Sequence, residues 1–72
     1  MSYENLTQLI TNINQYTTIE FANKYNEIVI DLLMKNENNI IYDSFMHIKE
    51  NYAEYFVEIC KLIGNKINPL NN

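Results

Sequence analysis

The sequence predicts an all-α fold, a small antiparallel bundle of three helices in which the C-terminal helix is the longest. Apolar side chains recur at spacings of three and four residues in three successive segments. The only glycine and the only proline are Gly64 and Pro69, so neither residue type interrupts a helix before position 64. With 72 residues the chain has room for one domain, which we place over residues 1–72.

The first helix is expected over residues 2–16, with Ser2 as its N-cap. Its apolar positions follow the helical period and comprise Tyr3, Leu6, Leu9, Ile10, Ile13 and Tyr16. At 100° per residue this stripe covers about 140° of the circumference. That width suits a helix packed on one core.

The second helix is expected over residues 18–35. Thr17 and Glu20 have the spacing of a capping box at its start. Its charged residues fall on one narrow strip, in which two pairs have favourable i,i+4 spacing, Glu20 with Lys24 and Asp31 with Lys35. The apolar arc extends over about 240° and includes Ile30 and Met34 at its outer edge. The polar run KNENN, residues 35–39, is expected to form the next turn.

The third helix is expected over residues 40–63, with Gly64 as its C-terminal cap and residues 65–72 as a loose tail. One apolar row has near-heptad spacing and contains Ile41, Phe45, Ile48, Tyr52, Tyr55, Phe56, Ile59 and Ile63. A second row, about 100° away, contains Tyr42, Met46, Ala53, Val57 and Cys60. We therefore expect more apolar surface on this helix than two neighbouring helices can cover.

The surplus apolar surface predicts association, because monomers seldom expose large contiguous apolar patches. We expect a homodimer or an obligate protein partner, bound through helices 2 and 3. The candidate interface residues are Ile30, Met34, Tyr42, Met46, Ala53, Val57 and Cys60. The alternative is a monomeric bundle in which helices 1 and 2 surround the longest helix.

Few residues suggest chemistry, and we predict no catalytic residue, cofactor or metal site. The single cysteine excludes an internal disulfide, and one histidine does not support a Cys/His zinc site. His47 lies one helical turn from Asp43 and is interpreted as a solvated surface residue. Cys60, in the second apolar row, is interpreted as a small packed hydrophobe with an unreactive thiol.

Charge limits the classes of partner. Nine acidic residues against five lysines give a net charge of −4, and arginine is absent, so direct nucleic-acid binding is not expected. No apolar stretch is long enough to cross a bilayer and no signal peptide is visible, so we expect no membrane partner and a cytosolic location. One acidic stripe on the third helix contains Asp43, Glu50, Glu54 and Glu58. Its rise of about 6 Å per step resembles phosphate spacing along a nucleic-acid strand.

These observations favour a small, acidic, non-enzymatic interaction protein, a regulator or inhibitor that occupies a surface of a larger protein. Richness in Asn and Ile is also typical of an AT-rich genome and is compatible with a phage or mobile-element accessory protein. The alternatives are a decoy that mimics nucleic acid through the acidic stripe, a structural subunit of a larger assembly, and a DNA-associated transcriptional regulator.

Overall fold

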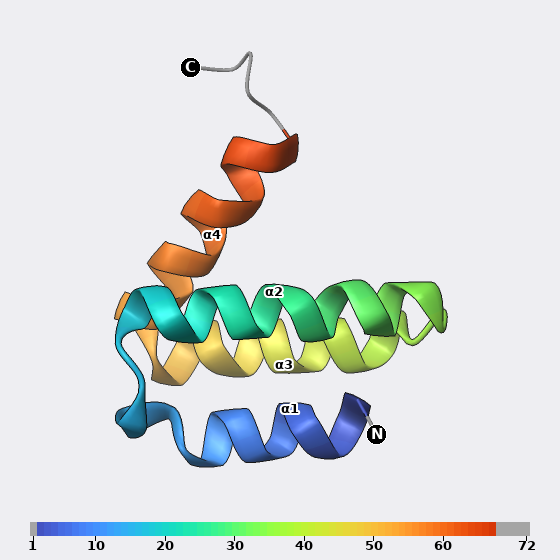
Figure 1. Cartoon of the computed structure of the whole chain (residues 1–72), viewed down its shortest axis with the longest axis horizontal. Coiled ribbons are helices and arrows are strands. Elements are labelled where there is room, and N and C mark those ends of the chain that lie inside the picture. Colours follow the sequence, from blue (N-terminus) through green and yellow to red (C-terminus); the bar gives the residue numbers. More distant parts are fainter. Residues whose placement is uncertain (1, 68–72) are drawn as a thin grey trace.

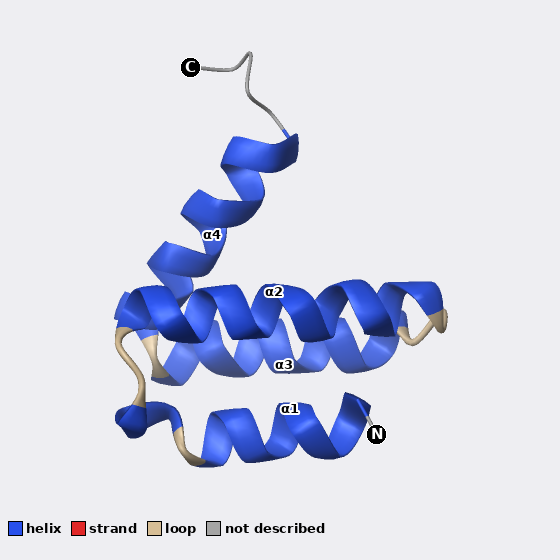
Figure 2. Ribbon diagram, viewed as in Figure 1, coloured by secondary structure: helices blue, strands red, loops and turns tan. Residues whose placement is uncertain are grey.

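The computed structural model describes residues 2–67 and, for side chains, residues 3–64. Over these residues the chain is all-α, as predicted. It comprises helices α1 (Ser2–Thr11), α2 (Thr18–Met34), α3 (Asn38–Asn51) and α4 (Ala53–Ile67), with a short 3₁₀ helix, η1 (Ile13–Gln15), between α1 and α2. Figure 2 shows that only short loops join these helices.

The first three helices lie alongside one another, and α4 runs obliquely to them (Figure 1). Helix α4 packs most extensively on α2 and also contacts α3, whereas α1 packs on α2. Every helix contributes to one buried apolar cluster, which contains Leu6, Leu9, Ile13, Phe21, Ala22, Tyr25, Leu32, Ile48 and Ile59. Helix α2 is therefore the element around which the others assemble.

The first helix is shorter than predicted, because it ends at Thr11 instead of residue 16. Both the backbone N–H and the side-chain amide of Asn12 donate to the carbonyl oxygen of Gln8, at 3.0 Å each. An Asn side chain that binds nearby backbone competes with the continuing helix. The 3₁₀ helix that follows still brings Ile13 into the core, at 2% exposure. Ser2 is the first residue of α1, and its side chain lies outside the described part of the structure.

Helix α2 confirms the second predicted helix to within one residue. The predicted capping box is present, because Thr17 Oγ1 accepts from Glu20 N at 3.1 Å and Glu20 Oε1 accepts from Thr17 N at 3.0 Å. Of the two predicted i,i+4 pairs, Asp31 and Lys35 form theirs, at 3.1 Å. The other is wrong, because Glu20 bonds Thr17 and the Lys24 ammonium lies over the Tyr16 ring.

A Schellman motif ends α2. Asn36 adopts the left-handed φ of 59°, and its N–H donates to the carbonyl of Leu33 at 3.0 Å. The N–H of Glu37 reaches back to the carbonyl of Leu32 at 2.9 Å. This pair of hydrogen bonds satisfies carbonyls at the end of the helix and fixes the turn toward α3.

The single long third helix predicted over residues 40–63 is wrong, because the chain breaks at Tyr52 into α3 and α4. Tyr52 has φ −138° and ψ 61°, outside the helical region. Gly64 lies inside α4 and has a negative φ, so its predicted role as a C-terminal cap is also wrong. Residues 65–67, predicted as part of a loose tail, belong to α4, and residues 68–72 lie outside the described residues.

A polar pair lies within the core. The hydroxyl groups of Tyr25 and Ser44 are 2.7 Å apart, on residues that are 1% and 8% exposed. Ser44 Oγ also donates to the carbonyl of Ile41 at 3.0 Å. Because Ser44 has one hydroxyl proton, Tyr25 is the donor between the two side chains. Burial raises the pKa of the Tyr25 hydroxyl above its ordinary value of 10.0.

Candidate protein-interaction surface

An open apolar groove lies where the second half of α2 and the first half of α3 meet the end of α4. It encloses about 280 Å³. The residues that line it are Val29 and Leu33 from α2, Asn38, Ile41, Tyr42 and Phe45 from α3, and Ile63 from α4. We call this feature the α2–α3–α4 groove. Apart from the Asn38 amide and the Tyr42 hydroxyl, its side chains carry no polar atoms, so it can bind an apolar group but offers little for chemistry.

The groove adjoins exposed apolar side chains on α2. Ile30 and Met34 are 47% and 79% exposed, and Leu33 between them is 54% exposed. Residues at i, i+3 and i+4 share one side of a helix, so these three form a continuous strip along the groove. On the opposite wall Tyr42 is 64% exposed. The groove is therefore bordered on two helices by large apolar groups that face water.

Three of the predicted interface residues, Ile30, Met34 and Tyr42, thus lie on or beside the groove. Leu33 and Phe45 also line the groove and were not among the predicted interface residues. Leu33 lies about 60° from Ile30 on the helical circumference. That closeness is the sequence signal that would have placed it with the exposed strip.

The remaining predicted interface residues are divided between two helices. Met46 is half-buried on α3, whereas Ala53, Val57 and Cys60 are exposed on α4. Phe56 and Ile59, on the adjoining part of the helical circumference, pack against the core. The continuous row from Tyr42 to Cys60 is a wrong prediction, because it depended on an unbroken helix. Cys60 was interpreted as a packed hydrophobe and is instead exposed.

The predicted acidic stripe is likewise divided. Asp43 and Glu50 are exposed on α3, and Glu54 is exposed on α4. Glu58 is partly buried, and its Oε2 lies 3.4 Å from Nζ of Lys61. The break at Tyr52 removes the regular rise along one axis from which the resemblance to phosphate spacing was derived.

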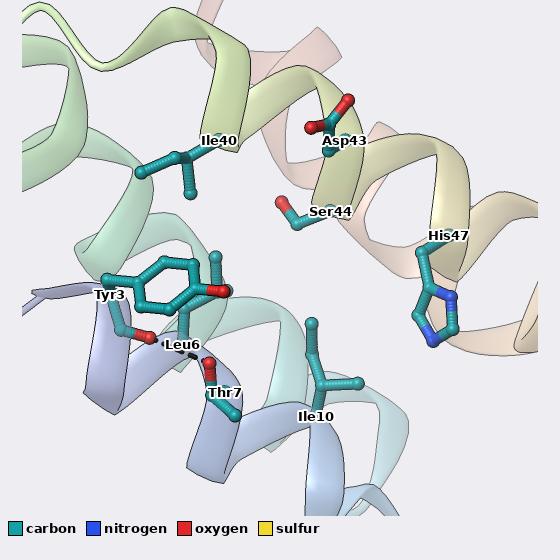
Figure 3. Close-up of a pocket in the computed structure, with 8 residues that line it drawn as sticks. All are labelled: Tyr3, Leu6, Thr7, Ile10, Ile40, Asp43, Ser44 and His47. Atoms are coloured by element: carbon teal, nitrogen blue, oxygen red, sulfur yellow. Dashed lines mark hydrogen bonds between the residues drawn. The ribbon is translucent and has the colours of Figure 1, made fainter.

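A second groove lies between α1 and α3 (Figure 3). It encloses about 250 Å³ and is lined by Tyr3, Leu6, Thr7, Ile10, Ile40, Asp43, Ser44 and His47. Figure 3 shows apolar side chains on its walls and the His47 ring at one end. The Ser44 hydroxyl is already engaged by Tyr25 and Ile41.

His47 is exposed, in agreement with its interpretation as a surface residue. Its Nδ1 lies 3.3 Å from the side-chain nitrogen of Asn51, which also donates to the His47 carbonyl at 3.0 Å. Its ring stands edge-on to Tyr52, with the centroids 5.9 Å apart. The His47 ring therefore contacts Asn51 and Tyr52, the residues at the end of α3 and at the break that follows it.

Within the described residues no three His, Cys, Asp or Glu side chains gather closely enough to hold a metal ion. Nor does any helix among residues 2–67 have both the length and the apolar character needed to cross a membrane. Comparison with models of known protein families gave no match, and neither curated proteins nor solved structures yielded a similar chain.

Proposed function

We propose that this chain is a small non-enzymatic interaction protein that acts as a regulator or inhibitor by binding a helix of a larger protein. In this proposal an antiparallel arrangement of α1, α2 and α3 is the scaffold, and the α2–α3–α4 groove is the binding site. The observation that carries the proposal is the groove itself, an open apolar cavity of about 280 Å³ bordered by exposed large side chains.

The physical reason is the cost of apolar surface in water. Burial of such surface contributes roughly 25 cal/mol per Å². Three side chains at the groove still expose much of their surface: Leu33 is 54% exposed, Met34 79% and Tyr42 64%. Burial of this surface by a partner would contribute free energy to binding. An amphipathic helix fits such a groove with apolar anchors at i, i+3, i+4 and i+7.

Charge favours a basic partner segment. The chain carries a net charge of −4 and no arginine. A field of this sign attracts lysine- and arginine-bearing segments and repels acidic ones, which raises the association rate for the former. The expected occupant is therefore an amphipathic helix with an apolar face and basic flanks.

The test uses a defined probe, a synthetic leucine–lysine peptide of about four helical turns with leucine at positions i, i+3, i+4 and i+7. We expect the peptide to shift the NMR signals of Leu33, Tyr42 and Phe45 in a saturable way. Leu33→Glu should abolish saturable binding, because it places a carboxylate in the groove. Asn23→Glu is the matched control, since it adds the same charge at an exposed position of α2 outside the groove lining.

Two outcomes would reject the groove as the binding site. One is the absence of saturable shifts in the wild-type protein. The other is equal binding by Leu33→Glu and Asn23→Glu, which would mean that the peptide responds to net charge alone. Thermal unfolding of both variants checks that each remains folded before the comparison is made.

A further inference from the structure

The break between α3 and α4 is not imposed by a glycine or a proline. The local competitor of a continuous helix is the Asn51 side chain, which donates to the His47 carbonyl at 3.0 Å as Asn12 does to that of Gln8. Tyr52 stands between Asn51 and Ala53, with no glycine or proline nearby. Hydrogen bonds on both sides keep α-helical spacing, because Tyr52 N donates to Ile48 O at 2.8 Å and Phe56 N donates to Tyr52 O at 3.0 Å. A change in the φ and ψ of this one residue would make α3 and α4 a single helix.

The turn between α2 and α3 differs in this respect. Asn36 holds a left-handed φ of 59°, and the Schellman hydrogen bonds of Asn36 and Glu37 close the end of α2. This turn is therefore specified by its own chemistry. Of these two connections, the one at Tyr52 is therefore the one that lets the following helix change its place.

Helix α4 is held mainly by side-chain contacts with α2 and α3. Ile59 is 1% exposed, Tyr55 meets Phe21 edge-on at 5.3 Å, and Phe56 meets Phe45 at 4.8 Å between ring centroids. The Tyr55 hydroxyl donates to the carbonyl of Tyr16 at 3.3 Å. A copy of α4 from another chain would present the same groups to the same partners.

We propose that α4 exchanges between two copies of this chain. Tyr52 takes up helical φ and ψ, α3 and α4 join into one helix, and each α4 packs on α2 of the second copy. The contacts of α4 are kept, while the first N–H groups of α4 gain the carbonyls of the last turn of α3 as partners. The homodimer predicted from the sequence then forms by exchange of α4, and Ile63 in each α2–α3–α4 groove comes from the second copy.

Ala53→Pro tests the exchange. Ala53 is exposed and is the first residue of α4, a position where proline is tolerated. At Tyr52 the φ of −138° lies in the range that a following proline prefers, and the ψ of 61° lies between the preferred ψ of about 120–160° and the helical region. The helical region, which exchange needs, is disfavoured before proline. We expect the dimer dissociation constant to rise on the order of 10,000-fold, because each of two joined helices would contain an interior proline. Thr18→Pro is the matched control, since it puts proline at the first residue of α2 after the extended Thr17.

The readout is the solution mass by light scattering, after refolding at concentrations from about 10 µM to about 1 mM, the range in which exchange can compete with docking of α4 on its own chain. Wild type and Thr18→Pro should dimerise, and Ala53→Pro should stay monomeric. In dimers made from isotope-labelled and unlabelled wild-type copies, filtered NOEs should connect Phe21 of one copy with Tyr55 of the other.

A wild-type chain that is monomeric throughout this range would overturn the exchange, as would a wild-type dimer in which Phe21 and Tyr55 touch only within one copy. A dimer that persists in Ala53→Pro would also overturn it. The NOE measurement decides the matter even if a proline variant fails to fold. The inference goes beyond the proposed function, because monomeric Ala53→Pro should still bind the leucine–lysine peptide in its groove.

Discussion

Replacement of Ser44 by alanine should destabilise the protein more than replacement of Tyr25 by phenylalanine, although each removes one hydroxyl group. In Tyr25→Phe the Ser44 hydroxyl keeps its hydrogen bond to the Ile41 carbonyl at 3.0 Å, so the loss is one hydrogen bond, about 1 kcal/mol. In Ser44→Ala the Tyr25 hydroxyl, on a residue 1% exposed, loses its acceptor. A buried donor without a partner costs about 1–3 kcal/mol, and the lost bond to Ile41 adds to it. We expect about 2–4 kcal/mol in total.

The assay is urea unfolding followed by far-UV circular dichroism, with the free energy of unfolding extrapolated to water. A domain of this length has roughly 4–10 kcal/mol of stability, so the expected differences are resolvable. The double variant Tyr25→Phe/Ser44→Ala should cost less than the sum of the two single variants, because it leaves no buried hydroxyl unpaired. Equal costs for the two single variants, or strict additivity in the double variant, would refute this account of the pair.

Three further predictions concern pH, the capping box of α2 and the packing of α4 on the core. Stability should fall as pH rises above 10.0, the ordinary pKa of tyrosine, because burial raises the pKa of Tyr25 in the folded state and the unfolded chain then loses its proton first. The slope should reach at most about 1.4 kcal/mol per pH unit, and Tyr25→Phe should lose this component; identical alkaline unfolding curves would contradict it. Thr17→Ala should cost about 1 kcal/mol in urea unfolding, whereas Thr17→Ser, which retains the capping oxygen, should cost little; equal losses would exclude the capping box as the cause. Ile59→Ala should cost about 2–5 kcal/mol, whereas Val57→Ala, at a side chain 49% exposed on the same helix, should cost less than about 1 kcal/mol; a reversed order of thermal midpoints would show that α4 packs through its other face.

Helix α2 could be predicted from the sequence because its signals are local. Thr17 and Glu20 are three residues apart, Asp31 and Lys35 are four apart, and both pairs interact as that spacing requires. The early end of α1 is also local in origin, since it depends on the Asn12 side chain. An Asn residue can lie within a helix or end it, and the spacing of apolar residues does not distinguish these two roles.

The break at Tyr52 could not be predicted, because its neighbourhood has no glycine or proline and its one local signal, Asn51, is a residue that a helix also accepts. The structure associates the break with long-range packing, in which Tyr55 contacts Phe21 and Phe56 contacts Phe45. The same break explains why only part of the candidate surface was predicted. The predicted interface residues that come before the break, Ile30, Met34 and Tyr42, lie on or beside the groove. The positions of α4 residues relative to those of α3 were derived from one continuous helix, which the structure does not contain.

The packing of α4 on residues distant in the sequence also affects the order of folding. The hydrogen bond between Tyr55 and Tyr16 joins residues 39 positions apart, whereas α1, α2 and α3 are joined by short connections. Contacts between distant residues form more slowly than local ones because a longer loop must close. During synthesis α4 also leaves the ribosome after α1, α2 and α3, so until then the face of α2 around Phe21 is uncovered in the nascent chain. We therefore expect the nascent chain to be most prone to aggregation just before α4 docks.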